Sequence, residues 1–128
     1  MMKRLEIKET SNTPHILFDI ESATFVIDGK SFPEDSKEFY RPLIEWVDQL
    51  ISNKGQISKF NLQFNLFYLS SSSIISVKQL LMKLVELQNA GVSVVVTWKH
   101  DDDDDDIKKT GEDYQKITKL NFTFEVND

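Results

Sequence analysis

Four consecutive serines, Ser70–Ser73, are the residues of this chain whose type and position could do chemistry. They lie between an apolar run that ends at Leu69 and another that begins at Ile74. Serine hydroxyls at such a junction can cap a helix, attack as nucleophiles, help to bind a phosphate, or accept one from a kinase. Capping needs one hydroxyl, which we expect Ser72 or Ser73 to supply, so the other serines are candidates for a second role.

Catalysis by these serines would require a general base that a third group orients. The chain has two histidines, His15 and His100, and nothing in the sequence places either one beside the serines. The four glycines form neither GxxxxGK nor GxGxxG, the patterns of glycine-rich phosphate loops. We therefore expect no enzymatic activity, no catalytic residue and no cofactor.

Six adjacent aspartates, Asp101–Asp106, form the second unusual segment. Calcium loops space their carboxylates and use glycine for the sharp turn, and neither feature occurs here. Adjacent like charges repel and stay solvated, so the pattern favours a flexible acidic loop. A metal site or a docking segment for a basic partner are the alternatives. They would make the protein a small ligand- or metal-binding module that uses residues 101–106.

Composition excludes several classes of function. The net charge is −6, and without the six aspartates 15 acidic residues balance 15 Lys and Arg. No basic patch is evident, so nucleic acid is not an expected partner. The chain has no cysteine, which fits a reducing compartment. The N-terminal residues lack an apolar signal-peptide core, and no apolar run approaches ~20 residues. We expect a cytoplasmic protein without a membrane partner.

The elements that must position these residues follow from hydrophobic periodicity. The expected order is β-β-β-α-β-α-β-α-β, a single α/β domain (1–128) with a mixed sheet. Pro42 is awkward within the first helix, and either follows a later helix start or kinks the first turn. The strands are expected at 4–9, within 14–30 as a hairpin closed near 21–23, and at 59–69, 92–98 and 121–126. The helices are expected within 31–55, capped by Asp35 or Ser36, and at 74–91, ending with Gly91 as C′, and 107–118.

The same periodicity predicts which faces are buried. The later strand–helix–strand units should be parallel with right-handed crossovers. Because each strand keeps a polar side, we expect the helices on one face of the sheet and water on the other. The expected inward strand positions include Phe60, Leu62, Phe64, Leu66 and Tyr68, against outward Asn61, Gln63, Asn65, Ser93, Thr97, Thr123 and Glu125. The expected helix anchors are Phe39, Leu43, Trp46, Val47, Leu50, Ile74, Val77, Leu81, Leu84, Ile107, Tyr114 and Ile117.

This arrangement would place the serines at the carboxyl end of a central parallel strand, where open α/β sheets carry functional groups. The following helix start offers free N–H groups and a positive dipole end. A phosphoacceptor within Ser70–Ser73 is therefore chemically reasonable beside plain capping.

Several segments resemble the SiaC family of bacterial regulatory phosphoproteins, which are STAS-like in shape and related in fold to anti-sigma-factor antagonists. The resemblance covers almost the whole chain. It includes Thr13-Pro14, SFPEDSKEFYRPLIEWV (31–47), YLSSSSI (68–74), GVSVVVTW (91–98), the acidic segment, and GEDYQKIT (111–118).

The resemblance implies a partner switch. A dedicated kinase would phosphorylate a hydroxyl in the strand-to-helix turn, and a metal-dependent Ser/Thr phosphatase would remove the phosphate. The unphosphorylated form would bind an effector, which in some members is a diguanylate cyclase. The family turn reads Tyr-Leu-Asn-Thr-Ser-Ser with the Thr modified, so its position falls on Ser71. The wider antagonist pattern, Asp-Ser-Ser-Gly-Leu, would select Ser72 instead.

We therefore predict Ser71 as the phosphoacceptor, with Ser72 as the second candidate. The partner-binding surface is predicted to comprise Ser70, Ser71, Ser72, Ser73 and the exposed edge of the second helix at Lys78, extending to Lys83.

Overall fold

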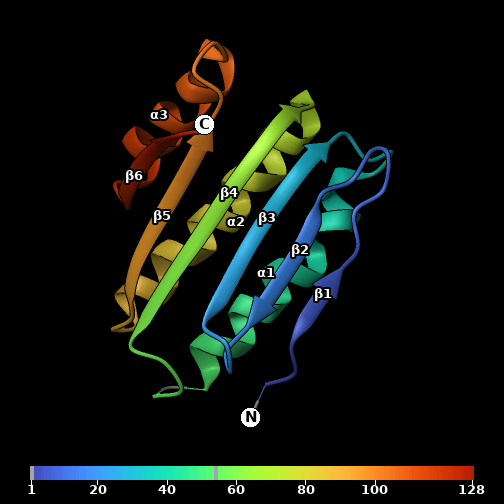
Figure 1. Ribbon diagram of the computed structural model, residues 1–128. Coiled ribbons are helices and arrows are strands. Elements are labelled where there is room, and N and C mark those ends of the chain that lie inside the picture. Colours follow the sequence, from blue (N-terminus) through green and yellow to red (C-terminus); the bar gives the residue numbers. More distant parts are fainter. Residues whose placement is uncertain (1, 54) are drawn as a thin grey trace.

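The computed structural model describes residues 2–53 and 55–128 and folds them into one sheet covered by three helices. The six strands lie across the sheet in chain order, from β1 to β6 (Figure 1). The strands are β1 (Leu5–Ile7), β2 (His15–Asp19), β3 (Thr24–Ser31), β4 (Lys59–Leu69), β5 (Ser93–His100) and β6 (Asn121–Val126). The helices are α1 (Ser36–Ser52), α2 (Ser71–Asn89) and α3 (Asp105–Thr118).

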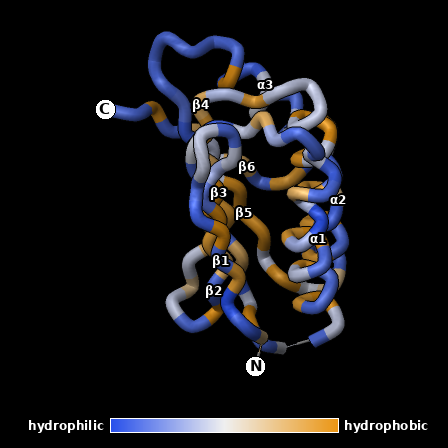
Figure 2. The backbone as a smooth tube through the Cα atoms, turned by 90° about the vertical axis from the view of Figure 1, so that its right-hand side faces the viewer, coloured by the Kyte–Doolittle hydropathy of each residue, from blue (hydrophilic) through white to orange (hydrophobic). Residues whose placement is uncertain are grey.

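The connections explain why the helices share one face. Strands β1, β2 and β3 are antiparallel, whereas β3, β4, β5 and β6 are parallel. One helix joins each parallel pair, and every crossover steps to the next strand in the same direction. Crossovers of one hand that all step the same way place their helices on one side of the sheet. Figure 2 shows α1 and α2 together on one side, and the predicted order and one-sided packing are confirmed.

The core lies between this helix layer and the sheet. At one end, the rings of Phe25 and Phe60 stack with their centroids 4.2 Å apart, and Phe18 meets Trp46 edge to face at 5.3 Å. The Trp46 indole N–H also donates to the carbonyl of Lys3 at 2.9 Å, which ties the residues before β1 to α1. The largest side chains that are fully buried are Trp98, Tyr40, Phe18, Phe60, Phe64, Ile16, Ile27, Leu43, Leu62, Leu66, Leu80 and Leu81.

The face of the sheet without helices carries the polar residues of the strands. Asn61 is exposed, and Gln63 and Asn65 are half-buried, as the alternation of β4 predicts. Thr97 is an exception because it is only 7% exposed, and its hydroxyl donates to the Asn61 side-chain oxygen at 3.0 Å. The prediction of a hydrated face is thus confirmed, with one buried hydroxyl that finds its partner on the next strand.

A β-bulge near the end of β4 breaks the predicted alternation. Leu66 pairs with Gly29 and Tyr68 pairs with Lys30, which leaves Phe67 as the extra residue between them. A bulge shifts the side-chain phase by one residue. Tyr68, predicted to point inward, is therefore 51% exposed, while Leu69 takes the buried position.

Helix α1 starts at Ser36, after Asp35, whose carboxylate accepts the Glu38 backbone N–H at 3.1 Å. Asp35 was one of the two predicted caps. The later helix start predicted for Pro42 is wrong, because Pro42 is the seventh residue of α1. Its nitrogen has no proton, so the carbonyl of Glu38 loses its usual helical donor. Pro42 lies on the exposed side of the helix, where water can reach that carbonyl.

Two predicted helix anchors, Ile74 and Ile117, are wrong, and a third, Phe39, packs against the core while only partly buried. Ile74 and Ile117 are 38% and 50% exposed, and Phe39 is only partly buried. In α1 the buried stripe runs through Tyr40, one residue after Phe39. The remaining predicted anchors are buried, and the residues that sequence reasoning did not place in the helix core are Ser36, Tyr40, Ser73, Ser76, Leu80, Leu87, Gly111 and Thr118.

Helix α3 approaches the sheet most closely at Gly111. A Cβ on this residue would lie 2.5 Å from Cδ1 and 2.8 Å from Cε2 of Trp98. The Trp98 ring is fully buried, and its N–H donates to the Ile107 carbonyl at 2.9 Å. The ring therefore has little freedom to move aside.

Replacing Gly111 with Ala should lower the free energy of unfolding by about 1–3 kcal/mol through overpacking against Trp98. Alanine normally stabilises a helix interior by about 1 kcal/mol relative to glycine, so the sign of the change is informative. Urea denaturation followed by circular dichroism measures it. The neighbouring exposed variant Glu112→Ala is the control, and its change should stay within about 0.5 kcal/mol. A Gly111→Ala protein as stable as the wild type would contradict this packing.

Candidate functional site

The serine turn, Ser70–Ser73, follows β4 at the carboxyl end of the parallel strands. Ser70 is the N-cap of α2: its backbone is extended, and its hydroxyl oxygen accepts the Ser73 N–H at 3.2 Å. The prediction that Ser72 or Ser73 caps the helix is therefore wrong. The Ser70 N–H donates to the carbonyl of Ser31 at 2.9 Å, so the chain leaves the sheet at Ser70 and the helix begins at once.

Ser73 is fully buried at the centre of a hydroxyl network, which we define as Ser31, Ser36, Tyr40, Ser70, Ser72 and Ser73. Its Oγ lies 2.8 Å from the Oγ of Ser31 and 3.0 Å from that of Ser70. A longer contact of 3.3 Å reaches the Oγ of Ser36. Ser31 ends β3 and Ser36 begins α1. One side chain thereby fastens the start of α2 to two other elements.

Tyr40 closes the network from α1. Its hydroxyl lies 2.8 Å from the Oγ of Ser31, and the residue is fully buried. Burial raises the pKa of Tyr40 to about 12, and the hydrogen bond with Ser31 offsets part of that rise. The phenol therefore stays neutral at physiological pH and can donate to Ser31 or accept from it.

Ser72 joins the beginnings of two helices. Its Oγ lies 2.8 Å from the Oγ of Ser36 in the first turn of α1 and 3.3 Å from that of Ser70. Ser72 is exposed as a residue, yet its hydroxyl is already engaged. The positive dipole ends of α1 and α2 consequently lie side by side at the serine turn.

Ser71 differs from its three neighbours. It is the first residue of α2 and is exposed. Within residues 2–53 and 55–128, no side-chain hydrogen bond involves its hydroxyl, whereas Ser70, Ser72 and Ser73 all belong to the hydroxyl network. The first turn of α2 also contains no acidic residue. Among the four predicted site serines, Ser71 combines exposure with an uncommitted hydroxyl.

Sequence reasoning missed three members of the network, Ser31, Ser36 and Tyr40. Ser36 and Tyr40 lie four residues apart and share the stripe of Leu43 and Val47, so helical spacing could have found them. Ser31 offered no such signal, because its partners are contributed by two other elements of the fold.

The hydrogen bonds of the turn do not include a histidine or a carboxylate among the described residues. In the part of the chain that the structure describes, the side-chain partners of Ser70, Ser72 and Ser73 are all hydroxyls. The histidines are engaged elsewhere: His15 lies 3.3 Å from a Glu6 carboxylate oxygen, and buried His100 contacts the Asp101 carbonyl at 2.9 Å through Nδ1. Among the described residues, neither histidine is hydrogen-bonded to a serine of the turn.

The two predicted partner-binding lysines have different environments. Lys78 is exposed on α2, seven residues after Ser71, and so lies about two turns along the same face. Lys83 is only 20% exposed and bridges Asp48 of α1, at 2.9 Å, and Glu86, at 3.0 Å. These carboxylates raise the pKa of Lys83 through hydrogen bonds and charge. Lys83 holds α1 and α2 together, and the structure does not present it as a free binding group.

The acidic segment is more ordered than predicted. Asp104 is the N-cap of α3, and its carboxylate accepts the Ile107 N–H at 3.0 Å. Asp105 and Asp106 occupy the first turn of this helix, where negative charge is favourable. The prediction of an acidic loop thus holds only up to residue 104. Among the described residues, no three His, Asp or Glu side chains are grouped so that they could hold a metal ion.

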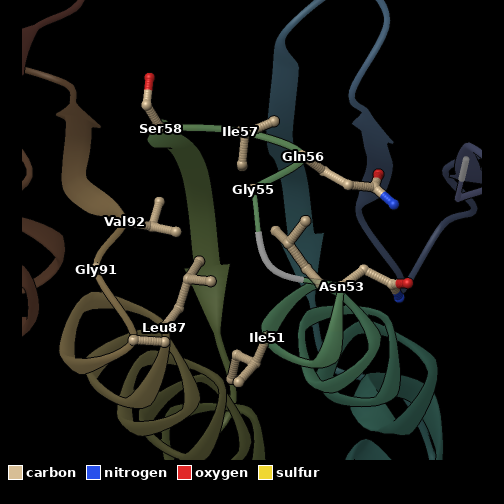
Figure 3. A pocket seen from close by; sticks show the side chains of 11 residues that line it. Ile51, Asn53, Gly55, Gln56, Ile57, Ser58, Leu87, Gly91 and Val92 are labelled. Atoms are coloured by element: carbon tan, nitrogen blue, oxygen red, sulfur yellow. The ribbon is translucent and has the colours of Figure 1, made fainter.

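A small pocket of about 190 Å³ lies at the other end of the molecule, where α1 and α2 finish and β4 begins. Figure 3 shows Ile51, Ile57, Leu87 and Val92 around it. None of its described lining residues carries a titratable side chain. The pocket offers apolar contacts and no acid–base chemistry.

No helix in the described ranges has the length and apolar character needed to cross a bilayer.

The one-sided mixed sheet and the serine turn define a small single-domain α/β protein. The family model for the SiaC family regulatory phosphoprotein matches residues 7–127, and the chain belongs to this family. A relative described as an uncharacterized protein of Pseudomonas aeruginosa (strain UCBPP-PA14) is 28% identical over 127 residues, covering 99% of both chains.

Solved structures agree with this assignment. SiaC of Pseudomonas aeruginosa is similar with a TM-score of 0.87 and 28% identity, covering 98% of this chain and 100% of the other. A second match, with a TM-score of 0.86 and 28% identity, is the crystal structure of diguanylate cyclase SiaD in complex with its activator SiaC from the same organism. It covers 96% of this chain and 99% of the matched one.

Two alanine substitutions should separate the buried and exposed serines. Ser73→Ala should lower the free energy of unfolding by about 1–3 kcal/mol, because it leaves buried hydroxyls of the network without a partner. Ser71→Ala should change it by less than about 0.5 kcal/mol, as expected for an exposed side chain. Urea denaturation of both variants provides the measurement. Equal losses of stability in the two proteins would be inconsistent with the hydroxyl network.

Proposed function

We propose that this protein is a cytoplasmic partner switch controlled by reversible phosphorylation of Ser71. A protein kinase adds the phosphate, a metal-dependent Ser/Thr phosphatase removes it, and the unphosphorylated protein binds a diguanylate cyclase as its effector. The serine turn, Ser70–Ser73, and Lys78 contact these partners. The protein itself catalyses no reaction.

The observation that carries this proposal is the exposed hydroxyl of Ser71, which has no hydrogen-bond partner within residues 2–53 and 55–128. A kinase must reach its acceptor oxygen and align it with the phosphoryl donor, so an accessible hydroxyl without a competing hydrogen bond is favoured. Ser72 remains the second candidate, but its phosphorylation would break the 2.8 Å contact with Ser36. Modification of Ser71 leaves the hydroxyl network intact.

Electrostatics also favour a phosphate at this position. A phosphoryl group adds a charge of about −1.5 to −2 at neutral pH. Negative charge near a helix N-terminus is stabilising by typically 0.3–1 kcal/mol at exposed sites. The first turn of α2 lacks an acidic residue, in contrast to α1 with Glu38 and α3 with Asp105 and Asp106. The start of α2 therefore favours a negative charge on Ser71.

Support for the effector comes from the solved complex, in which a SiaC protein of the same fold is the activator of the diguanylate cyclase SiaD. The similarity extends over almost the full length of both chains. A diguanylate cyclase is accordingly the effector that we assign to this protein.

Intact-mass spectrometry of the protein purified from its native host should show a population carrying one added phosphate. The Ser71→Ala variant should lack this population, and Ser72→Ala should keep it. A phosphate that persists in Ser71→Ala and disappears in Ser72→Ala would transfer the assignment to Ser72. Absence of phosphate from the wild type under every growth condition would count against the switch.

Charge reversal at Lys78 should weaken the interaction with the host's diguanylate cyclase. Lys78→Glu is expected to slow association at low salt, and the difference from wild type should shrink as salt screens the charge. Surface plasmon resonance with the purified cyclase measures the rates. Lys59→Glu is the matched control, because this exposed lysine starts β4, at the far end of the strand from the serine turn. Identical rates for Lys78→Glu and wild type would remove Lys78 from the interface.

A further inference from the structure

The two edges of the sheet differ in how well they are protected from pairing with another strand. Edge strands are commonly protected by shortness, charged side chains, proline or a bulge. At one edge, β1 has only three residues, and the charged side chains of Arg4 and Glu6 lie beside it and on it. At the other edge, β6 is a six-residue strand that contains neither lysine nor proline, and it pairs with β5 without a register shift (Figure 1). The edge at β6 therefore lacks the protection that β1 has.

The backbone of β6 shows which of its polar groups point away from the sheet. The Asn127 N–H donates to the His100 carbonyl at 2.8 Å, so the backbone of Asn127 faces β5. Backbone groups of alternate residues in a strand point to opposite sides. Phe122, Phe124 and Val126 therefore direct their N–H and C=O groups outward, where no strand of residues 2–53 and 55–128 lies.

The side chains of the same three residues are incompletely covered. The rings of Phe122 and Phe124 stack with their centroids 5.8 Å apart, and both pack against the core while only partly buried. Helix α3 packs mainly on β4, β5 and α2, so the outermost strand receives less cover. Val126 is 53% exposed. A strand added beside β6 would satisfy the outward backbone groups and cover these apolar side chains at the same time.

The sequence of β6 is complementary to itself in one antiparallel register. With a twofold axis at Phe124, this residue lies opposite Phe124 of the second copy, and Phe122 lies opposite Val126. Because their backbone groups point outward, these facing residues exchange both N–H···O=C bonds. Thr123 lies opposite Glu125, so the two carboxylates stay apart. An axis at Thr123 would place Val126 beyond the end of the facing strand, and an axis at Glu125 would place two carboxylates face to face.

We propose that β6 is the interface of a symmetric dimer, in which two copies of this chain pair their β6 strands antiparallel about Phe124 and form one continuous sheet. Both copies contribute the same surface, as in other twofold dimers. Because β6 runs parallel to β4, the two serine turns would lie at opposite ends of this sheet. The dimer requires neither phosphate nor cyclase, so it stands or fails independently of the proposed function.

Sedimentation velocity of the full-length protein over a range of concentrations tests the dimer. The wild type should shift from monomer to dimer as the concentration rises. Val126→Pro removes an outward N–H that β5 does not use, and symmetry removes it from both strands, so the dissociation constant should rise about tenfold or more. Val126→Thr is the matched control, because it keeps the N–H and a β-branched side chain, and it should dimerise more tightly than Val126→Pro. Circular dichroism checks that both variants keep the fold.

Disulfide cross-linking tests the register, because the chain has no cysteine of its own. Thr123 and Glu125 of the second copy would form a non-hydrogen-bonded pair with Cα atoms about 4.5 Å apart, which is within reach of a disulfide. Oxidation of a mixture of Thr123→Cys and Glu125→Cys proteins should therefore give a cross-linked dimer of the two variants. Either variant alone should cross-link poorly, because its two thiols are out of register.

Four results would overturn the proposal or part of it. A wild type that stays monomeric at every concentration would exclude the dimer. A dimer that Val126→Pro leaves unchanged would place the interface elsewhere on the molecule. Equal weakening by Val126→Pro and Val126→Thr would exclude pairing through the backbone. Efficient cross-linking of Thr123→Cys with itself would reject the register about Phe124.

Discussion

The hydrogen bond between the buried hydroxyls of Ser31 and Ser73 decides where the rest of the serine turn lies. It joins the end of β3 to the first turn of α2, and the parallel pairing of β3 with β4 brings these two ends together. Tyr40 and Ser36 then fix α1 to the same point. Buried hydroxyls are tolerated only when they are hydrogen-bonded. In this network each buried hydroxyl has another hydroxyl as its hydrogen-bond partner. The hydroxyl network therefore holds the exposed side of the turn in a fixed position.

Much of the fold followed from periodicity. The bounds of β4 and β6 agree with the predicted strands residue for residue, because each strand alternates between apolar and polar side chains. The polar side of every strand also led to the correct inference that the helices occupy one face. The errors have local causes. Sequence alternation cannot reveal the bulge that turns Tyr68 outward, and the hydroxyl of buried Tyr40 has its partner, Ser31, on another element.

The candidate site was predictable in position and not in detail. Composition and order placed a serine run at a strand end, and the resemblance selected Ser71 within it. Four identical residues contain no signal that distinguishes the cap from its neighbours, so the wrong serine was chosen as the cap of α2. Ser31 and Ser36 are remote from the run in sequence. Lys83 forms an ion pair with Asp48 on the neighbouring helix α1, and the sequence alone could not identify this partner.

The helical geometry of the turn has an evolutionary consequence. Successive residues of an α-helix are separated by about 100° of rotation, so a run of identical side chains samples different surroundings. The four serines consist of one cap, one exposed hydroxyl, one link to α1 and one buried hub. Their repetition in the sequence therefore provides no redundancy. A one-residue deletion would leave three serines for these four places, so an apolar neighbour, Leu69 or Ile74, would have to occupy the N-cap or the buried hub.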